Sequence, residues 1–489
     1  MTKLSTSWTA AARLACAVAL IGATPGAMAK VEGVTGTSFT LVAKSGYISI
    51  ADGGSIYNWG YALQTGGGAQ FQYPGPTLIV NQGDVVEITL INELPTNVSL
   101  LFPGQIDVTA TQFTNAATPP AGFTGPIPAG CIGGADSERS AVGRITREAR
   151  PRGCLKYSFV ASKPGTYTYH SGTQMPVQLE MGLFGALIVR PTAAPNQAYE
   201  HAGTRFDREH LLMLSEIDPV WHEAVRVQAQ AVTLPTSNGS FVWNVDTTGF
   251  ATRNPLYWFI NGRTAPDTIN GSYVPELPGQ PYNALPRMHP GERLLMRTIN
   301  AGRDLHPFHT HGNNTWTVAV DGRMLASAPG AGPDLARSDN TLRMVPGQTV
   351  DAIYEWTGKG LNWDAYGIAD DHTCNGVTIA EAIANPADPR LLLNGSHDPV
   401  TREFCPDHGK PLPTVIPSQL EMTFGDLFSG SPYLGSKGGV PVGAGRLGSG
   451  GAYFHMWHSH NEREIINNGI FPGGMMTFVV IEPQNVPID

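Results

Sequence analysis

Two copies of one histidine pattern are the feature of this sequence that most directly indicates chemistry. Residues 306–311 read His-Pro-Phe-His-Thr-His, and residues 455–460 read His-Met-Trp-His-Ser-His. Side chains two positions apart on a β-strand point to the same face, so each copy would present two imidazoles in one direction. Two such strands side by side would bring four nitrogen donors to a common focus. The doubled pattern predicts a metal site, and because imidazole suits copper, zinc, iron and nickel, the spacing leaves the metal open.

Strands and turns are the elements that the composition predicts for positioning these histidines. The 489 residues include 57 Gly and 39 Pro, only 15% are charged, and 41% are hydrophobic. Residues 86–90 alternate apolar with polar side chains, as do residues 167–170, which is the period of half-buried strands. The hydrophobic content excludes a wholly disordered or collagen-like chain. The net charge of −9 gives no reason to expect a nucleic acid or an anionic membrane as partner.

The distribution of strand-like segments predicts two domains. We expect a first domain at residues 30–191, a polar linker at 192–207 and a second domain at 208–489. The strand pattern is lost between about 372 and 451, which we interpret as a loop-rich insertion that contains a short helix at 378–385. Too few positions separate the histidines at 170 and 306 to accommodate a complete further domain easily. A three-domain arrangement remains the alternative.

The N-terminus has the pattern of an export signal. Residues 1–29 contain Lys3 and Arg13, then an apolar run and an Ala-Met-Ala end, which is typical of a cleaved signal peptide. We therefore expect a periplasmic or secreted protein, with no other segment long enough to span a membrane. Cleavage would remove Cys16 and change the net charge from −9 to −11. Four cysteines would remain, and although three pairings are open, the simplest is Cys131–Cys154 with Cys374–Cys405.

Several motifs, in this order along the chain, make the sequence similar to the multicopper oxidase family, which is built from cupredoxin domains. They are Pro-Gly-Pro-Thr-Leu-Ile-Val at 74–80 with Gly-Asp at 83–84, Gly-Thr-Tyr-Thr-Tyr-His-Ser at 165–171, the histidine motif at 306–312, and His-Ser-His at 458–460 followed by Gly-Gly-Met-Met at 473–476. The resemblance extends from about residue 70 to 482. It implies an all-β fold of two cupredoxin-like Greek-key β-sandwich domains, the second carrying the insertion.

The sequence departs from that family at several copper-ligand positions. Residues 101–104 read Leu-Phe-Pro-Gly where the family has His-x-His-Gly, and Ser459 replaces the cysteine of the family's His-Cys-His motif. The later type 1 histidine falls at Glu464, although the earlier one is retained as His306. A blue type 1 copper requires a thiolate, and the four remaining cysteines are expected in disulfides. We therefore predict that the blue centre is missing.

The resemblance also implies which residues hold copper. The predicted ligands of a reduced cluster of one or two copper ions are His170, His309, His311, His458 and His460. His306 and His455 are further candidates, either as ligands of a separate small site or, for His455, as a residue that supports the ligands from behind. Both could equally be buried, hydrogen-bonded histidines. Glu464 is a candidate proton relay, and the catalytic residues are otherwise unknown.

These expectations favour an exported copper-dependent oxidoreductase that oxidises a small molecule or a metal ion directly at the histidine-held copper, with O2 as a candidate oxidant. In two-domain members of the family the copper cluster lies between subunits, which implies a homotrimer in which His170 of one subunit faces the other ligands of the next. The alternative is a non-catalytic protein that binds copper for tolerance or retains only the scaffold, because fold alone does not determine function.

Overall fold

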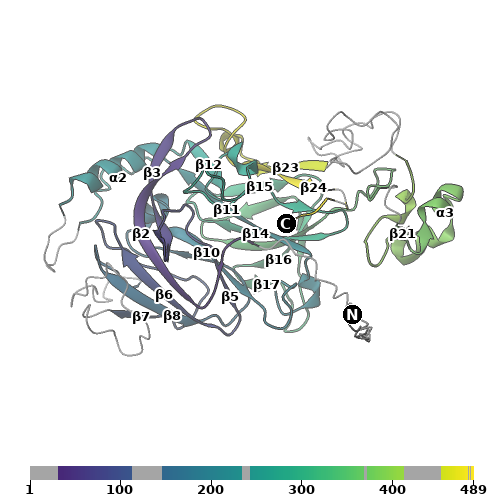
Figure 1. Cartoon of the computed structure of the whole chain (residues 1–489), viewed down its shortest axis with the longest axis horizontal. Coiled ribbons are helices and arrows are strands. Elements are labelled where there is room, and N and C mark those ends of the chain that lie inside the picture. The colour runs from purple at the N-terminus through teal and green to yellow at the C-terminus, as the bar shows by residue number, and fades with distance from the viewer. Residues whose placement is uncertain are drawn as a thin grey trace, which may run out of the picture.

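The computed structural model describes residues 31–112, 146–233, 243–367, 372–411, 453–482, 484 and 486–488. These residues form four large sheets and one short two-stranded sheet. The large sheets pack in two pairs, one built before residue 191 and one after residue 207 (Figure 1). The expected all-β, cupredoxin-like sandwich fold is therefore confirmed. The boundaries of the two domains and of the linker stay predictions.

The first pair contains a six-stranded and a four-stranded sheet. The six-stranded sheet has the order β4-β3-β2-β6-β8-β7 and the four-stranded sheet the order β1-β5-β10-β9. The strands are β1 Val34–Thr35, β2 Ser38–Ser49, β3 Ser55–Thr65, β4 Gly68–Ala69, β5 Leu78–Asn81, β6 Val85–Asn92, β7 Thr109–Gln112, β8 Cys154–Val160, β9 Gly165–His170 and β10 Phe184–Arg190.

The second pair contains a seven-stranded and a five-stranded sheet. The first has the order β12-β11-β14-β20-β16-β17, with β18 also paired to β16, and the second the order β13-β24-β23-β15-β19. The strands are β11 Arg208–Ile217, β12 Tyr257–Ile260, β13 Arg287–Met288, β14 Arg293–Asn300, β15 His306–Thr310, β16 Thr315–Val320, β17 Arg323–Met324, β18 Arg337–Asp339, β19 Thr341–Met344, β20 Thr349–Glu355, β23 Tyr453–Ser459 and β24 Met476–Ile481. No further pair of sheets is present among the described residues.

Helices are short and lie at the ends and edges of the sheets. The α-helices are α1 Met175–Glu180, α2 Pro219–Ala231 and α3 Ile379–Ala384, and the 3-10 helices are η1 Ala202–Thr204, η2 Asp267–Ile269, η3 Pro389–Ser396, η4 Cys405–Asp407 and η5 Glu462–Ile465. Helix α2 starts where the Asp218 carboxylate accepts hydrogen bonds from the backbone N–H groups of Val220 and Trp221, which satisfies donors that have no partner in the first turn. None of the helices in the described ranges is long and apolar enough to cross a membrane.

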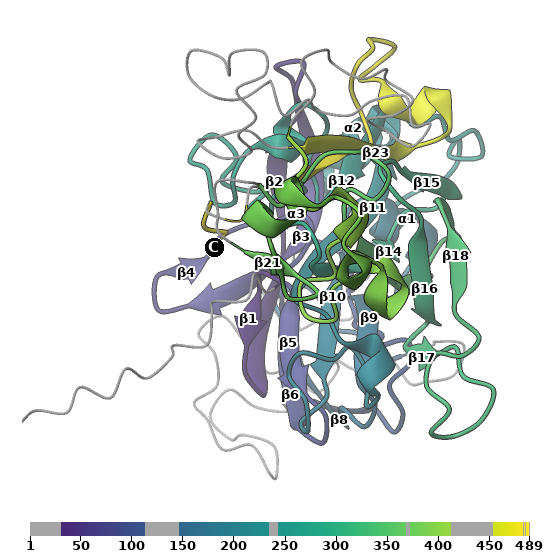
Figure 2. The same cartoon turned by 90° about the vertical axis from the view of Figure 1, so that its right-hand side faces the viewer.

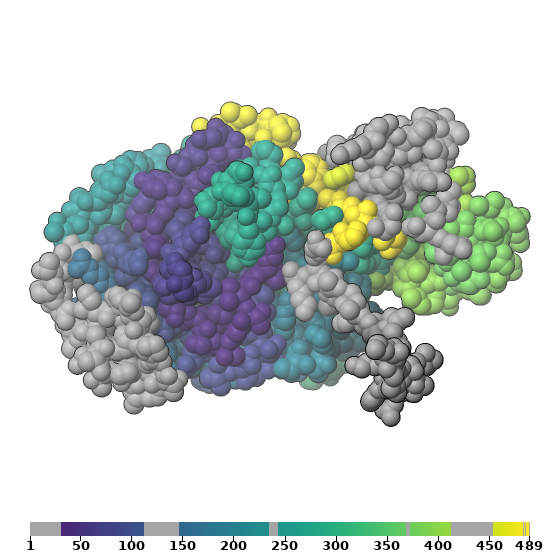
Figure 3. Space-filling model, viewed as in Figure 1, coloured from purple at the N-terminus to yellow at the C-terminus, as the bar shows by residue number. Residues whose placement is uncertain are grey.

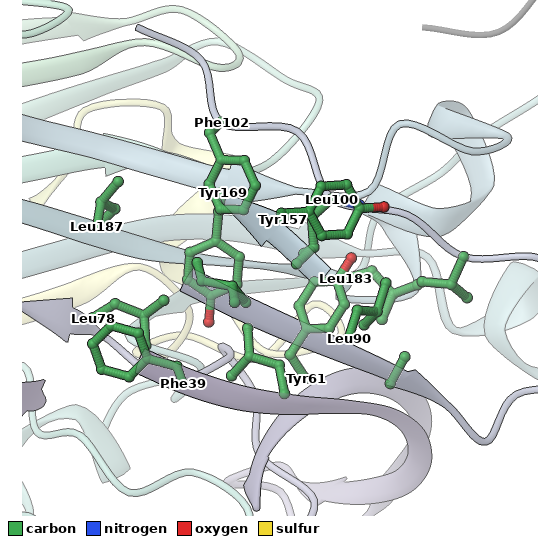
Figure 4. Close-up of a cluster of buried hydrophobic side chains, with 14 of the residues drawn as sticks. Phe39, Tyr61, Leu78, Leu90, Leu100, Phe102, Tyr157, Tyr169, Leu183 and Leu187 are labelled. Carbon is green, nitrogen blue, oxygen red and sulfur yellow. The ribbon is translucent and has the colours of Figure 1, made fainter. Parts of the chain in front are cut away.

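Three apolar cores hold these layers together. Inside the first pair, Phe39, Tyr61 and Leu90 of one sheet face Leu78 and Tyr169 of the other (Figure 4). A second core fills the other pair, and a third joins the two pairs. The third core packs Phe184 and Ile188 of β10 against Met213 of β11, Phe259 of β12 and Ile299 of β14. Because this joint is itself an apolar core, the two sandwiches are held as one packed body.

The alternation that predicted β6 is confirmed, since Val86, Ile88 and Leu90 are all buried in the first core. Strand β9 differs from its predicted half-burial, because both of its faces are buried. Its threonine face is covered by the second sandwich, where the Thr166 hydroxyl donates to the Asp351 carboxylate over 2.5 Å. A strand that lies between two sandwiches has no solvent face, which a local pattern of polar residues does not reveal.

The described part of the predicted insertion forms a small lobe at one end of the molecule (Figures 1 and 3). We use "the lobe" for residues 372–411, which contain α3, η3, η4 and a hairpin of β21 Thr373–Cys374 with β22 Val377–Thr378. In the turned view the lobe stands in front of the second sandwich (Figure 2). The predicted short helix at 378–385 is confirmed as α3, whose Thr378 and Glu381 form a reciprocal N-terminal cap.

Disulfides were expected in two pairs. Cys374 and Cys405 are bonded inside the lobe, which confirms that pair. Cys131 lies outside the described residues, so its pairing with Cys154 stays a prediction. The predicted glycine-rich loop at 425–451 and the signal peptide at 1–29 also lie outside the described residues.

The first prediction concerns this disulfide. The bond spans 31 positions of sequence, and closing a loop of that length removes on the order of 3–4 kcal/mol of chain entropy from the unfolded lobe. Replacing Cys374 and Cys405 together by Ser should therefore speed amide hydrogen exchange in the lobe, while exchange in β11 and β14 stays unchanged and serves as the internal control. Equal exchange rates in the lobe of both proteins would contradict the prediction.

Candidate metal centre

The two histidine motifs lie on neighbouring strands. Strands β15 and β23 pair antiparallel, with His309 opposite His458 and Phe308 opposite Ser459. His311 and His460 follow at the ends of these strands, so the two pairs of imidazoles meet at one edge of the five-stranded sheet. Residues separated by about 150 positions in the sequence are thus brought together by one strand register.

Four imidazole rings gather at this edge. The ring centre of His309 lies 4.8 Å from that of His311, 5.6 Å from that of His458 and 4.9 Å from that of His460. A nitrogen of each of His309, His311 and His458 lies within 4.8 Å of the others, close enough for one metal ion. His311 and His458 are buried, whereas His460 is exposed at the rim.

Hydrogen bonds fix which nitrogen of each ring is free. The Nδ1 of His458 lies 2.7 Å from the Ser459 carbonyl oxygen, which only accepts, so this nitrogen carries the hydrogen. The Nδ1 of His309 lies 2.8 Å from the Thr341 hydroxyl, which donates onward to Asn340. In both rings the Nε2 lone pair is therefore the available one. An imidazole held in this way by its second nitrogen is the usual state of a metal ligand.

The ring nitrogens of His311 and His458 are arranged for binding a metal ion rather than for hydrogen bonding to each other. The Nε2 atoms of His311 and His458 face each other at 3.2 Å, and the buried Nδ1 of His311 has no hydrogen-bond partner among the described residues. Burial, and then the charges of neighbouring histidines, lower the pKa of His309 and His311 to about 4. Burial also lowers the pKa of His458 to about 4. All three rings are neutral near pH 7, as ligation requires.

His170 lies apart from this group within one chain. It ends β9 and lines a separate cavity of about 290 Å³ with Met175, Phe184 and Gly302. Its Nδ1 lies 2.9 Å from the Ser171 carbonyl, the same arrangement as in His458, and burial lowers its pKa. His170 thus presents a free Nε2, but no contact in the described residues joins it to His309, His311 or His458.

His306 has a different role from the candidate ligand role that the sequence suggested. Its Nδ1 lies 2.8 Å from the Glu464 carboxylate and its Nε2 lies 2.9 Å from the Glu216 carboxylate, and all three side chains are buried. Burial alone would lower the pKa of His306, but the hydrogen bonds and charges of Glu216 and Glu464 outweigh it and raise the pKa to about 9. Because both nitrogens are engaged, His306 is an ion-paired cation rather than a metal ligand.

This ion pair occupies the place where the resemblance would put a type 1 copper. The Ser459 hydroxyl donates to the Glu464 carboxylate over 2.6 Å, so Glu464 bonds to both of the other positions, His306 and Ser459, that correspond by the resemblance to a type 1 site. Glu464 also accepts from Asn461, and none of its contacts in the described residues reaches His309, His311 or His458. Its predicted role as a proton relay therefore receives no support from these contacts.

The charges continue away from His306 in alternating sign. Arg253 donates to Glu216 and to Glu180, each over 2.5 Å. Glu180 belongs to α1 of the first sandwich, and burial raises its pKa to about 7 although Arg253 opposes this shift. We call the five groups Glu180, Arg253, Glu216, His306 and Glu464 the charge chain. Sequence reasoning missed its first three members, because each is an ordinary charged residue far in sequence from any histidine motif.

His455 does not meet His306. It is fully buried on β23, and neither ring nitrogen has a hydrogen-bond partner in the part of the chain that the structure describes. The centre of its ring lies 5.9 Å from that of Trp356. The ring also packs against Gly312, since a Cβ added to this glycine would lie only 2.5 Å from the His455 ring. The suggested small site of His306 with His455 therefore receives no support from these contacts, because both nitrogens of His306 contact carboxylates on other elements.

Comparison with known proteins shows sequence similarity to copper oxidases. Over 161 residues the chain is 30% identical to L-ascorbate oxidase of Cucumis sativus, a match that covers 33% of this chain and 22% of that protein. It is 26% identical over 288 residues to Laccase-7 of Oryza sativa, covering 57% of this chain and 39% of that protein. It is 24% identical over 338 residues to Copper resistance protein A of Escherichia coli, covering 65% of this chain and 48% of that protein. The chain thus spans less than half the length of each of these relatives.

No family model matches the chain. Among solved structures, "Multicopper Oxidase mgLAC" is 15% identical with a TM-score of 0.48, and the alignment covers 92% of this chain and 87% of that one.

The charge chain predicts a pH-dependent stability. The pKa of His306 is about 9 in the folded chain and about 6.5 in an unfolded one. The charged pair therefore stabilises the fold fully below pH 6.5 and loses this contribution as the pH rises through 9. His306→Gln should lower the free energy of unfolding by about 3 kcal/mol at pH 6, and the difference should shrink toward pH 9.5. Urea unfolding across this range measures it, and a difference independent of pH would contradict the assignment.

A third prediction concerns Ser459. Ser459→Cys alone should not give the intense blue absorption of a thiolate-bound copper, because both nitrogens of His306 stay bound to carboxylates. Adding Glu464→His removes one of these carboxylates and supplies a second imidazole, which completes the His2Cys set of a blue site. We expect the band only in the double variant after loading with Cu2+. An equally intense band in the single variant would show that the ion pair does not exclude copper.

Proposed function

We propose that this member of the multicopper oxidase family is an exported copper-dependent oxidoreductase whose copper is held by histidines alone, without a blue centre. The observation that carries the proposal is the convergence of His309, His311 and His458 with their Nε2 atoms free or facing one another. Copper is the metal implied by the similarity to laccases and ascorbate oxidase. The signal-like N-terminus supports export.

The ligand set that we propose is His309, His311, His458 and His460, for one or two copper ions per chain. Bound copper would supply a redox-active Lewis acid that accepts electrons from a reduced substrate and passes them to O2. The chain's own contribution is to keep His309, His311 and His458 neutral, to orient His309 and His458 through their Nδ1 hydrogen bonds, and to bury His311 and His458 away from water. The exposed position of His460 leaves one side of the group open to a small molecule or a metal ion.

In this proposal, His170 joins the copper ligands of a neighbouring subunit rather than those of its own chain. Within the chain it lies in its own cavity with a free Nε2, as expected for a ligand that serves a neighbouring copy. The resemblance to two-domain members of the family implies a homotrimer, in which a rotation closes the ring of contacts. The molar mass in solution by light scattering tests this part, and a monomer that binds copper normally would contradict it.

The substrate must come to the histidine-held copper itself. In the family, a blue centre carries electrons from a distant substrate, and here the charge chain fills that place. We therefore propose direct oxidation of a small molecule or metal ion docked at the rim. Oxidation of a substrate bound near His306 is disfavoured, since that residue is buried and ion-paired.

A second candidate function is copper binding without catalysis, for tolerance. Two observations favour it: the chain lacks the thiolate route for electrons, and one of its relatives is named Copper resistance protein A. This candidate uses the same ligands, so the two functions differ only in whether bound copper turns over.

One experiment distinguishes these candidates. The mature protein is loaded with copper, its copper is counted and examined by electron paramagnetic resonance, and O2 uptake is measured with phenols, Fe2+, Mn2+ and Cu+. We expect one or two copper ions per chain and O2 uptake with at least one substrate class. His309→Ala with His458→Ala should abolish both copper binding and O2 uptake, whereas His397→Ala, in the lobe, should change neither.

The outcomes separate cleanly. Copper binding without O2 uptake supports the copper-binding candidate. No copper in the wild-type protein contradicts both candidates and leaves the scaffold role. Unchanged copper content in the His309→Ala, His458→Ala variant would show that these histidines are structural.

A further inference from the structure

A second group of metal-ligating side chains lies where the lobe meets the second sandwich, and none of its members belongs to the histidine motifs. Its members are Asp364, His372, Glu403 and His408, and one ligand atom of each lies within 4.8 Å of the others. Asp364 comes from the loop that follows β20 of the second sandwich, and the other three come from the lobe. The group therefore joins two segments of different origin. We call it the lobe cluster.

Both histidines of the lobe cluster face both carboxylates. The Nε2 of His372 lies 3.1 Å from Glu403 and 3.7 Å from Asp364. The Nδ1 of His408 lies 2.8 Å from Glu403 and 3.5 Å from Asp364. Asp364, Glu403 and His408 are buried, and the His372 side chain is 20% exposed. The four donors thus converge on one small region that is largely buried.

The two buried carboxylates of the lobe cluster require a cation to balance their charge. Two buried carboxylates are costly unless they are paired, and within the described residues no Lys or Arg forms an ion pair with Asp364 or Glu403. Two protonated histidines would balance them, but the rings of His372 and His408 have centres only 4.9 Å apart, so their like charges would repel. One divalent cation neutralises both carboxylates and leaves both imidazoles neutral.

The fold holds the four donors in place without a metal ion. The Cys374–Cys405 bond lies two residues after His372 and two residues after Glu403, so it fixes the spacing of these two side chains. The Asp364 carboxylate accepts hydrogen bonds from the backbone N–H groups of Tyr366 and Gly409. The second bond ties the loop after β20 to the residue that follows His408. Such support from outside the ligands is what orients a metal site.

We propose that Asp364, His372, Glu403 and His408 bind a divalent transition-metal ion of the Zn2+ class, which fastens the lobe to the second sandwich. Two imidazoles and two carboxylates supply four protein ligands and leave no open position on a tetrahedral ion, which indicates a structural rather than a catalytic site. The mixture of nitrogen and oxygen donors also separates it from the all-imidazole group of His309, since the harder carboxylates favour Zn2+ over Cu+. The proposal does not depend on the function proposed above.

Zn2+ titration of the full-length mature protein tests the site. The parent for this experiment carries His309→Ala and His458→Ala, so that the histidine group cannot capture the ion, and it is stripped with a chelator before calorimetry. We expect one Zn2+ per chain. Adding Glu403→Gln and His408→Ala should weaken binding by at least about 100-fold, because each removes a direct ligand. His397→Ala, in the same lobe but outside the cluster, is the matched control and should bind as the parent does.

A second measurement covers the case in which the buried variant fails to fold. His372→Gln changes the least buried ligand, and amide hydrogen exchange then compares the lobe with and without Zn2+. Zn2+ should slow exchange in the lobe of the parent and not in that of His372→Gln, with exchange in β11 equal in both. The proposal is overturned if the stripped parent binds no Zn2+, if the ligand variants bind it as tightly as the parent does, or if Zn2+ leaves exchange in the lobe unchanged.

Discussion

A buried imidazolium held between two carboxylates is the interaction on which the rest of the candidate site depends. His306 lies at the start of β15, Glu216 on β11 and Glu464 on η5, so one cation joins both sheets of the second sandwich to the segment that follows β23. Arg253 and Glu180 extend the alternating charges to α1 of the first sandwich. Removing His306 would leave the buried Glu464 carboxylate without a cationic partner among the described residues, which costs several kcal/mol. The strand ends that carry His309 and His458 are therefore fixed by electrostatics a few residues away.

The same interaction decides what chemistry is open to the protein. Replacement of a cysteine by Ser459 and of a histidine by Glu464 would each weaken a blue copper site, but together they create a new bonded unit with His306. The place that a second metal centre would take is filled by a stable hydrogen-bonded network. What remains accessible is the imidazole group at the adjacent strand edge, in which His309 and His458 are neutral and are oriented by their Nδ1 hydrogen bonds.

The lobe cluster resembles the histidine group in that the fold holds its donors in place, but its donors differ. In the histidine group, strand register supplies the geometry and all the donors are imidazoles. In the lobe cluster, a disulfide and two backbone hydrogen bonds supply the geometry, and two carboxylates add the charge. A signal for it was present in the sequence, since His372 and Glu403 each lie two residues before a cysteine and His408 lies three residues after Cys405. Nothing local indicates that Asp364 joins them, because it belongs to a loop of the sandwich.

The sequence by itself determined the kinds of donor and the limits on them: two His-x-x-His-x-His motifs, no cysteine near either, and alternating strands such as β6. It also predicted α3, because its capping residues act locally. Only the tertiary structure decided how these parts are used. It turned His306 into an ion-paired cation, buried both faces of β9, separated His170 from the other histidines and brought Asp364 to the lobe. The reason is physical: alternation and capping act between near neighbours, whereas register, burial and charge pairing are set by side chains that lie far apart in the sequence and meet only when the chain packs.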